Sequence, residues 1–591
     1  MRRFLLIVLL LISCIFSAQV SSAQTDDENA STFFGHWAYQ FNAPIKLNSF
    51  LNDGWPGALG IYADLVEPPL AYFRWSTYQD YEGLLATKWN FEDDGSRFVV
   101  TLRDDAQWSD GSPLTARDLV VTYLIGRLRG IQDYRYVDTV TAQDDHTVVF
   151  TFKRSTLFAE RLILKTRVRP ASVYGAIADK VQALLDTNDN LKRFDSSELQ
   201  ATAEWKALQE ELNEFRPQQV VSSGSYTLAA ADITATQVTL HRNETSVFKP
   251  TFDSIVIYRG NADKILPRIQ SGEITIDYSG DQYSPDIEPA LEEMGYQILR
   301  TPTYSGAALY FNHDRYTLGK VEVRQALAYL LDRKLIAEAS LADSAEPVNL
   351  ISGLSEDRQG FYLTERRRFD AYEPDTAKAE AMFTALGFTK NSRGAWLDDQ
   401  GEPIAFHLTF PAEVPRYPQA AAEIARQLTE FGISVRVDGV TSTQLLRDVV
   451  DGRFDLLLYT YGVIGNPFPF LTYRNTFYSL NEPGLSQGKK GIAFPLTQTV
   501  DGEQFDLAAL TASLEDEQSN EGATADAVGQ IAYVYNKLLP ILPLYERHTN
   551  TPLLVTKLSG VPSSDDPIYK NAYTADNYVI LWLLEGTIAP K

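Results

Sequence analysis

The sequence predicts an exported α/β protein built from several lobes, and three observations support this prediction. The chain has 591 residues, too many for a single hydrophobic core. Between Ile404 and Tyr461, segments typical of strands alternate with segments typical of helices. The first 23 residues have the composition of a secretory signal.

The signal is recognised from its charge and its apolar length. Arg2 and Arg3 precede an apolar run of 9 residues, Phe4 to Ile12, which suits a signal peptide and is too short to span a bilayer. Two processing sites compete. Cleavage after Ala23 would release a soluble protein with a flexible leader over residues 24–32, whereas Leu11 to Cys14 resembles a lipobox, in which Cys14 would be lipidated. We favour cleavage after Ala23.

The composition of the remaining chain excludes several classes of function. Cys14 is the only cysteine, so the body has no disulfide and no thiolate chemistry. Loss of the two signal arginines lowers the net charge from −24 to −26, which repels nucleic acid and anionic lipid headgroups. No run of 18 apolar residues follows residue 24, so no transmembrane span is predicted.

In the N-terminal half, strands are predicted at Phe98–Leu102 and Val148–Phe152. A helix begins between them at Thr115, because Asp118 stands three residues on in the arrangement of a capping box. From Gln182 to Pro217 the composition shifts to Glu, Lys, Asn and Ala, and we expect an exposed, charged helical insertion there.

Further strands and helices follow in pairs. A strand at Phe252–Tyr258 precedes a short helix at Ala262–Gln270. A strand at Ala307–Phe311 precedes one long amphipathic helix over Val321–Ala342, because its leucines recur at helical spacing.

The most regular stretch predicts a mostly parallel sheet with right-handed crossovers. Its three strands are Ile404–Phe410, Ile433–Val437 and Phe454–Tyr459, and the helices between them, Pro418–Phe431 and Ser442–Asp451, stop at Gly432 and Gly452. Ligands of such sheets bind at the carboxyl ends of strands, which points to Tyr459–Asn466.

Several segments, taken in order, carry a resemblance to a known family. They are Trp89–Gly95, Phe98–Arg103, Trp108–Val120, Ser271–Asp277, Leu309–Asn312, Val323–Arg333 and Gly452–Leu456. Together they resemble the family 5 extracellular solute-binding proteins, the oligopeptide- and dipeptide-binding class of ABC importers.

This resemblance implies a periplasmic-binding-protein-like fold (type II, cluster C), with two main lobes joined by a hinge and an inserted extra lobe. The expected boundaries are lobe I at 33–75, 218–301 and 541–591, lobe II at 76–217 and lobe III at 302–540. The resemblance also implies a monomer in the periplasm or at the outer face of the cytoplasmic membrane. It would deliver an oligopeptide or oligosaccharide, held between lobes I and III, to the permease subunits of an ABC importer, with no cofactor and no catalysis.

One departure from the family pattern concerns the ligand. Peptide binders of the family carry a carboxylate shortly after the strand equivalent to Phe454–Tyr459, but residues 459–471 contain none. A ligand ammonium buried near Val463 would therefore be unpaired, at a cost of several kcal/mol. Aromatic and amide side chains suit neutral sugars, which keeps an oligosaccharide receptor as the alternative. The candidate ligand-binding residues are Asn42, Trp55, Trp75, Tyr459, Tyr461, Asn466 and Phe468.

Rival chemistries find little support in the sequence. Gly484 to Gly488 matches the Gly-x-Ser-x-Gly pattern of hydrolases, but polar residues flank it where a strand and a helix are needed. The six histidines form no metal-binding spacing, so no metal site is expected. A secreted glycoside or ester hydrolase remains a distant alternative, because paired carboxylates could converge in a cleft.

Overall fold

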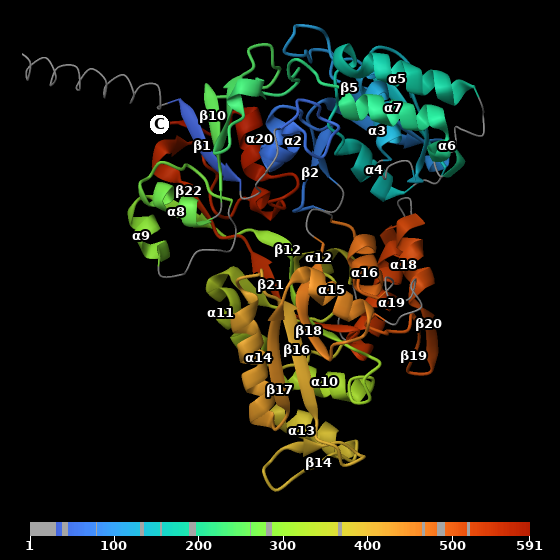
Figure 1. Ribbon diagram of the computed structural model, residues 1–591, viewed down its shortest axis with the longest axis vertical. Coiled ribbons are helices and arrows are strands. Elements are labelled where there is room, and N and C mark those ends of the chain that lie inside the picture. Colours follow the sequence, from blue (N-terminus) through green and yellow to red (C-terminus); the bar gives the residue numbers. More distant parts are fainter. Residues whose placement is uncertain are drawn as a thin grey trace, which may run out of the picture.

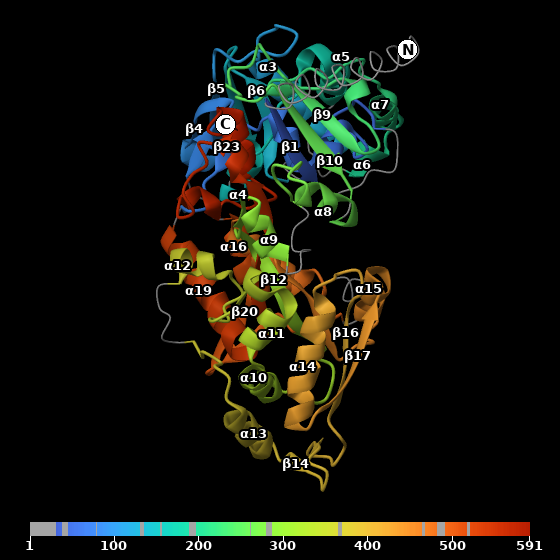
Figure 2. The same cartoon turned by 90° about the vertical axis from the view of Figure 1, so that its left-hand side faces the viewer.

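Strands and helices assemble into two bodies, one above the other, joined by two long strands (Figure 1). The computed structural model describes residues 31–37, 45–77, 80–130, 135–153, 156–187, 197–260, 262–278, 287–363, 369–463, 467–481, 491–516 and 521–591. The upper body contains the N-terminal half of the chain together with the C-terminal helix, and a view turned by 90° shows the same division (Figure 2).

Lobe I forms one part of the upper body around a four-stranded sheet in the order β1-β10-β9-β8. The strands are β1 (Thr32–Trp37), β8 (Tyr226–Thr227), β9 (Gln237–Arg242) and β10 (Ser254–Arg259), and β1 runs parallel to β10. Helix α8 occupies Ala262–Gln270, as predicted. The apolar helix α20 (Tyr578–Glu585) returns the chain to this lobe near its C-terminus (Figure 1).

Lobe II is built on a second four-stranded sheet in the order β4-β5-β7-β6. Its strands are β4 (Ala86–Glu92), β5 (Arg97–Leu102), β6 (Val137–Ala142) and β7 (Thr147–Phe152), and its helices are α3 (Ala116–Arg129), α4 (Leu157–Leu164), α5 (Ala171–Asp186), α6 (Ser197–Ala201) and α7 (Ala203–Glu214). Thr115 and Asp118 form the predicted capping box at the start of α3. The described part of the charged insertion is helical at α6 and α7, but it is not fully exposed as predicted, because α7 buries Trp205 and Leu212.

Lobe III forms the lower body around a six-stranded sheet in the order β13-β21-β12-β18-β16-β17. The strands are β12 (Pro302–Phe311), β13 (Ala345–Pro347), β16 (Ala405–Pro411), β17 (Ser434–Val440), β18 (Leu456–Gly462) and β21 (Ile541–His548). As predicted, β16 runs parallel to β17 and to β18. The prediction of a mostly parallel sheet is wrong, however, because β12 pairs antiparallel with β18 and β21, and β13 pairs antiparallel with β21. The expected boundaries place residues 541–548 in lobe I, but β21 pairs with β12 in this sheet.

The helices of lobe III differ from the prediction at one place. The expected single helix over Val321–Ala342 is wrong, because α10 (Val321–Leu330) ends before α11 (Arg333–Leu341) begins. Leu331 is extended, and the Asp332 carboxylate accepts hydrogen bonds from two N–H groups of the new helix. The other helices of this lobe are α12 (Glu356–Tyr362), α13 (Thr376–Ala385), α14 (Tyr417–Phe431), α15 (Ser442–Val450), α16 (Pro469–Tyr478), α18 (Leu507–Asp516) and α19 (Glu521–Leu538).

The hydrophobic core divides in the same way as the two bodies. One continuous cluster of buried side chains joins lobe I to lobe II, from Phe33 through Phe98 to Trp582. A separate cluster fills lobe III, from Ala307 to Tyr545. Relative motion is therefore expected between the upper body and lobe III rather than between lobes I and II.

The two bodies meet at β12 and β21, which lie between them (Figure 1). The strands approach closely at Gly306, where an added Cβ would lie 1.8 Å from the Tyr545 carbonyl oxygen. Tyr304, at the start of β12, has a φ of +56°, an uncommon value for a residue with a side chain. Such backbone persists only where neighbouring contacts hold it in place.

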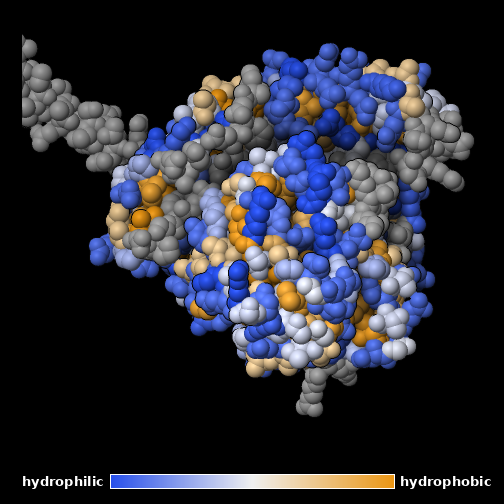
Figure 3. Space-filling view, turned by 60° about the horizontal axis from the view of Figure 1, so that its bottom comes forward, coloured by the Kyte–Doolittle hydropathy of each residue, from blue (hydrophilic) through white to orange (hydrophobic). Residues whose placement is uncertain are grey.

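The described part of the chain contains no helix long and apolar enough to cross a membrane. On the face shown in Figure 3, hydrophilic residues are interspersed with smaller hydrophobic areas.

Candidate functional site

A small cavity lies where the upper body meets lobe III. Trp75 lines it from lobe I and Tyr304 from β12, while Ser355, Arg358 and Thr472 are among the residues that line it from lobe III. Its volume of about 10 Å³ is close to the least that holds one water molecule. A larger ligand can reach these side chains only when the two bodies move apart.

Trp75 is held by contacts on every side and is only 1% exposed. Its ring stacks on Tyr304, with 4.5 Å between centroids and 27° between planes. Its indole N–H donates to Asp576 over 3.1 Å, and its backbone N–H donates to the side-chain oxygen of Asn571 over 3.1 Å. The geometry fixes the orientation of an aromatic face at the junction of the two bodies.

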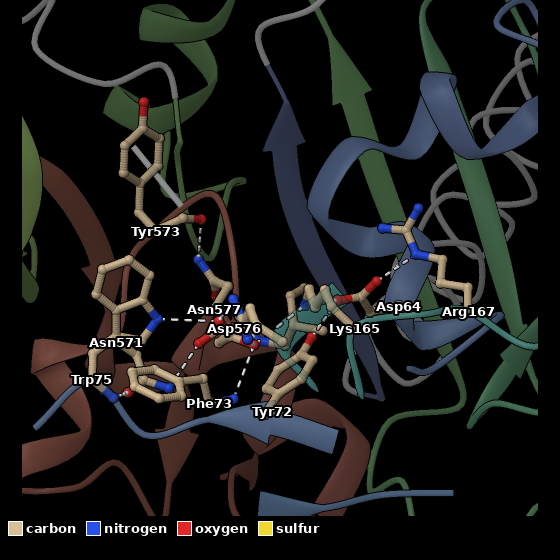
Figure 4. A network of polar contacts seen from close by, with 12 residues as sticks. Asp64, Tyr72, Phe73, Trp75, Lys165, Arg167, Asn571, Tyr573, Asp576 and Asn577 are labelled. Carbon is tan, nitrogen blue, oxygen red and sulfur yellow. Dashed lines mark hydrogen bonds and ion pairs between the residues drawn. The ribbon is translucent and has the colours of Figure 1, made fainter. Parts of the chain in front are cut away.

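Asp576 is the centre of the polar network that holds Trp75 (Figure 4). Its carboxylate is fully buried and accepts hydrogen bonds from both terminal nitrogens of Arg161 on α4 and from the backbone N–H of Phe73. Burial alone would raise the pKa of the Asp576 carboxyl, but Arg161 and Lys165 outweigh it and hold the pKa below its usual range. Asp576 is therefore charged at neutral pH.

The network continues to a second buried carboxylate, Asp64 (Figure 4). Asp64 accepts hydrogen bonds from Arg167 over 2.6 Å, from Tyr72 over 2.6 Å and from Lys165 over 3.2 Å. Burial opposes ionisation of Asp64, but Arg167 and Lys165 lower its pKa to about 2. The network thus ties lobe I to the α4 region of lobe II, which agrees with their shared core.

A second contact between the bodies involves Phe468, one of the residues that the sequence singled out. Phe468 is 9% exposed and packs with Tyr136 and Phe158 of lobe II. The Tyr136 hydroxyl donates to Glu515 on α18, and Arg135 pairs with the same carboxylate at 3.2 Å. Lobe II therefore also contacts lobe III in this structure.

The other predicted residues lie in different surroundings. Trp75 lines the cavity, whereas Trp55 is 1% exposed in the core shared by lobes I and II. Tyr459 is half-buried on β18 and meets the edge of Tyr310, with 6.2 Å between ring centroids. Tyr461, on the same strand, is 2% exposed.

Other predictions fall outside the described residues. They concern the signal peptide with Cys14, the leader up to residue 30, Asn42, Asn466 and the Gly484–Gly488 motif. Among the described side chains, no group of three His, Cys, Asp or Glu residues could hold a metal ion.

The Tyr461 hydroxyl donates to Glu546 of β21 over 3.3 Å. Glu546 also accepts from the backbone N–H of Glu356 over 2.8 Å and is 8% exposed. Burial raises the pKa of the Glu546 carboxyl to about 8, so it is mainly protonated at neutral pH. The Glu546 carboxyl that contacts the start of α12 is therefore mainly neutral.

Sequence reasoning missed three residues of this site: Tyr304, Arg358 and Asp576. Arg358 reaches across the junction, and its Nη2 donates to the Trp75 carbonyl oxygen over 2.6 Å. Its guanidinium carbon lies 4.9 Å from the ring centroids of both Trp75 and Tyr304. No local pattern marks these residues, because their partners stand far away in the chain.

Comparisons with known proteins agree with this architecture. The profile described as bacterial extracellular solute-binding proteins, family 5 Middle, matches residues 80–483. A probable D,D-dipeptide-binding periplasmic protein of Escherichia coli is 22% identical over 491 residues, covering 82% of this chain and 84% of that protein.

Solved structures show the same fold. A periplasmic oligopeptide-binding protein of an ABC transporter from Thermotoga maritima has a TM-score of 0.71 at 19% identity, covering 95% of this chain and 100% of that one. A mannohexaose-bound structure of such a protein from the same organism has a TM-score of 0.63 at 18% identity, covering 95% and 99%. These likenesses confirm the predicted fold class.

Proposed function

This chain belongs to the bacterial extracellular solute-binding proteins, family 5, as its sequence motifs indicated, and we propose that it captures an oligopeptide or oligosaccharide for an ABC importer. The ligand is enclosed between lobes I and III. The observation that carries this proposal is the cavity whose walls come from both bodies, with Trp75 on one side and Arg358 on the other.

In this proposal, the importer recognises the closure of the upper body and lobe III around the ligand. A ligand that touches both bodies stabilises only the closed arrangement and so shifts the population towards it. Capture at micromolar concentration requires about 8 kcal/mol net, after the cost of bringing the bodies together. Trp75, stacked and hydrogen-bonded in place, offers a fixed aromatic surface that loses little conformational entropy on binding.

A receptor specific for oligosaccharides is the second candidate, and the chemistry of the cavity favours a sugar over a peptide with a free amino terminus. No carboxylate is among the described residues that line the cavity, so a ligand ammonium would find no counter-charge there. The related protein from Thermotoga maritima was solved with mannohexaose bound. We keep Trp75, Tyr459 and Phe468 as proposed ligand contacts, with Asn42 and Asn466 as polar partners.

The protein acts as a receptor in this proposal and not as an enzyme, because its family binds solutes and the described residues that line the cavity include no pair of carboxylates. Its partners are the permease subunits of the importer. It works outside the cytoplasmic membrane, as the relatives named periplasmic do, and its N-terminal signal supports export.

The experiment is a thermal-shift screen of the protein lacking residues 1–23 against short peptides, α- and β-linked oligosaccharides and nickel chelates. A ligand at 100 times its dissociation constant adds about 2.7 kcal/mol of stability, which raises the melting temperature visibly. Each hit is then incubated overnight and analysed by chromatography, because a receptor returns its ligand intact whereas a hydrolase cleaves it. Stabilisation by nickel chelates alone, or cleavage of a hit, would refute the proposal.

A further inference from the structure

The cavity between the two bodies contains one charged side chain, Arg358, among the described residues that line it. Arg358 stands on α12 of lobe III and is 6% exposed. Tyr304, Trp75 and Phe361 surround its guanidinium, with ring centroids 4.9 to 5.4 Å away. Aromatic faces attract the cation but supply no full negative charge.

The buried guanidinium of Arg358 has an N–H donor without an acceptor. A guanidinium has five N–H donors, and Nη2 uses one on the Trp75 carbonyl oxygen. Nε is buried and has no acceptor. A buried donor without an acceptor costs about 1–3 kcal/mol, and more when it belongs to a charged group. The side chain is thus buried but only partly satisfied.

In the part of the chain that the structure describes, the carboxylates near this cation have other partners or are neutral. Asp357 pairs with Lys570 at 2.6 Å. Glu356 accepts hydrogen bonds from the backbone N–H groups of residues 349 and 350. The pKa of Glu546 is raised to about 8 by burial, so that group is mainly neutral. Among the described residues, no carboxylate forms an ion pair with Arg358.

We infer that Arg358 is the recognition site for a carboxylate carried by the ligand. Nε and a neighbouring Nη form one edge of the planar fork that binds both oxygens of a carboxylate. The hydroxyls of Ser355 and Thr472 line the same cavity and can donate further hydrogen bonds. Because the cavity is now no larger than one water, the carboxylate enters with the bodies apart and is enclosed as they close.

This inference rests on the proposed function and narrows its ligand. The carboxylate can come from an acidic sugar, such as a uronic acid, or from the carboxyl terminus or an acidic side chain of a peptide. In both cases the site selects an anionic ligand over a neutral one of the same size, because only the anion neutralises a buried guanidinium.

Two matched pairs of ligands test the inference by isothermal titration calorimetry. The sugar pair is β-1,4-mannopentaose and the β-1,4-linked pentamer of mannuronate, which differ only in oxidation at C6. The peptide pair is N-acetylated penta-alanine as the free acid and as the C-terminal amide. In at least one pair we expect the acid to bind about 30-fold more tightly than its neutral partner, equivalent to about 2 kcal/mol.

Variants then assign the preference to Arg358. Arg358→Gln is expected to reduce the preference for the acid to less than 3-fold, while Arg358→Lys keeps the charge without the fork and retains an intermediate preference. The matched control is Arg436→Gln, since Arg436 is an exposed arginine of lobe III, at 76% side-chain exposure. The control should keep the full preference.

The outcomes separate this inference from the proposed function. If neutral and acidic members bind equally, the carboxylate site is refuted while the receptor function stands. If Arg358→Gln weakens both members of a pair equally, Arg358 serves only as a contact between the bodies, and the inference is again refuted. If none of the four probes binds, both proposals fail for these ligand classes. Should Arg358→Gln fail to fold, Arg358→Lys decides the matter: a preference lowered to an intermediate value supports the inference, and an undiminished preference refutes it.

Discussion

Replacing Asp576 by alanine tests whether the buried network holds the upper body together. The carboxylate is fully buried and faces Arg161, whose side chain is 4% exposed. Removing it leaves the Arg161 guanidinium without its counter-charge. The nearby Lys165 cannot replace that charge, because it is itself a cation, and it keeps its own ion pair with Asp64 at 3.2 Å. Breaking a buried pair from one side costs about 3–5 kcal/mol. The N–H groups of Trp75 and Phe73 lose their acceptor as well.

We therefore expect Asp576→Ala to destabilise the upper body by at least about 3 kcal/mol, measured as a lower midpoint of urea unfolding followed by tryptophan fluorescence. The matched control is Asp179→Ala in lobe II. Asp179 pairs with Arg117, but their side chains are 65% and 46% exposed. An exposed pair contributes about 0–1 kcal/mol. Equal losses in the two variants would show that water compensates Arg161, and the reasoning from burial would be refuted.

The pH dependence of this contribution follows from the lowered pKa of Asp576. Above the unfolded pKa, near 3.8, the carboxylate is ionised in both states and its full contribution is present. As the pH falls through the lower folded pKa, that contribution is lost. The difference in stability between wild type and Asp576→Ala should therefore be constant from pH 5 to 7 and shrink below pH 4; a difference that grows on acidification would contradict this assignment.

Three further variants test other parts of the structure. Trp55→Ala should cost about 3–5 kcal/mol in urea unfolding, because Trp55 is 1% exposed in the core; a loss below 1 kcal/mol would contradict that packing. Tyr459→Ala should weaken ligand binding in calorimetry with little change in stability, since Tyr459 is half-buried; unchanged affinity would remove it from the site. The pKa of Glu546 is raised to about 8, so the folded state keeps a proton that the unfolded state loses above about pH 4.5. The free energy of unfolding therefore decreases as the pH rises from about 4.5 to about 8. Glu546→Gln should flatten that fall in urea titrations at pH 5 and pH 8, and an unaltered slope would show that Glu546 is not its source.

Local structure was predictable where neighbouring residues decide it. Thr115 and Asp118 satisfy the backbone at the start of α3, and Gly432 ends α14 at a φ of +104°, which glycine adopts without strain. The break between α10 and α11 was missed although Asp332 is a favoured capping residue, because the apolar spacing continues across it.

The site shows the limit of this reasoning. Trp75 was predicted as an aromatic of the right kind, and it lines the cavity. Trp55 has the same chemistry and lies in the core, since the sequence names a residue type but not the space around it. Likewise, the sequence showed that no carboxylate follows β18, but it did not show that Arg358 lines the cavity.

The sequence by itself determined the alternation of strands and helices and the family, because each depends on residues close together in the chain or on motifs in a fixed order. Only the tertiary structure decided which side chains meet. Arg161 and Asp576 are 415 residues apart, and Arg358 and Trp75 are 283 apart. Such contacts arise only when segments far apart in the chain pack together, and packing across the whole chain, rather than local preference, selects them.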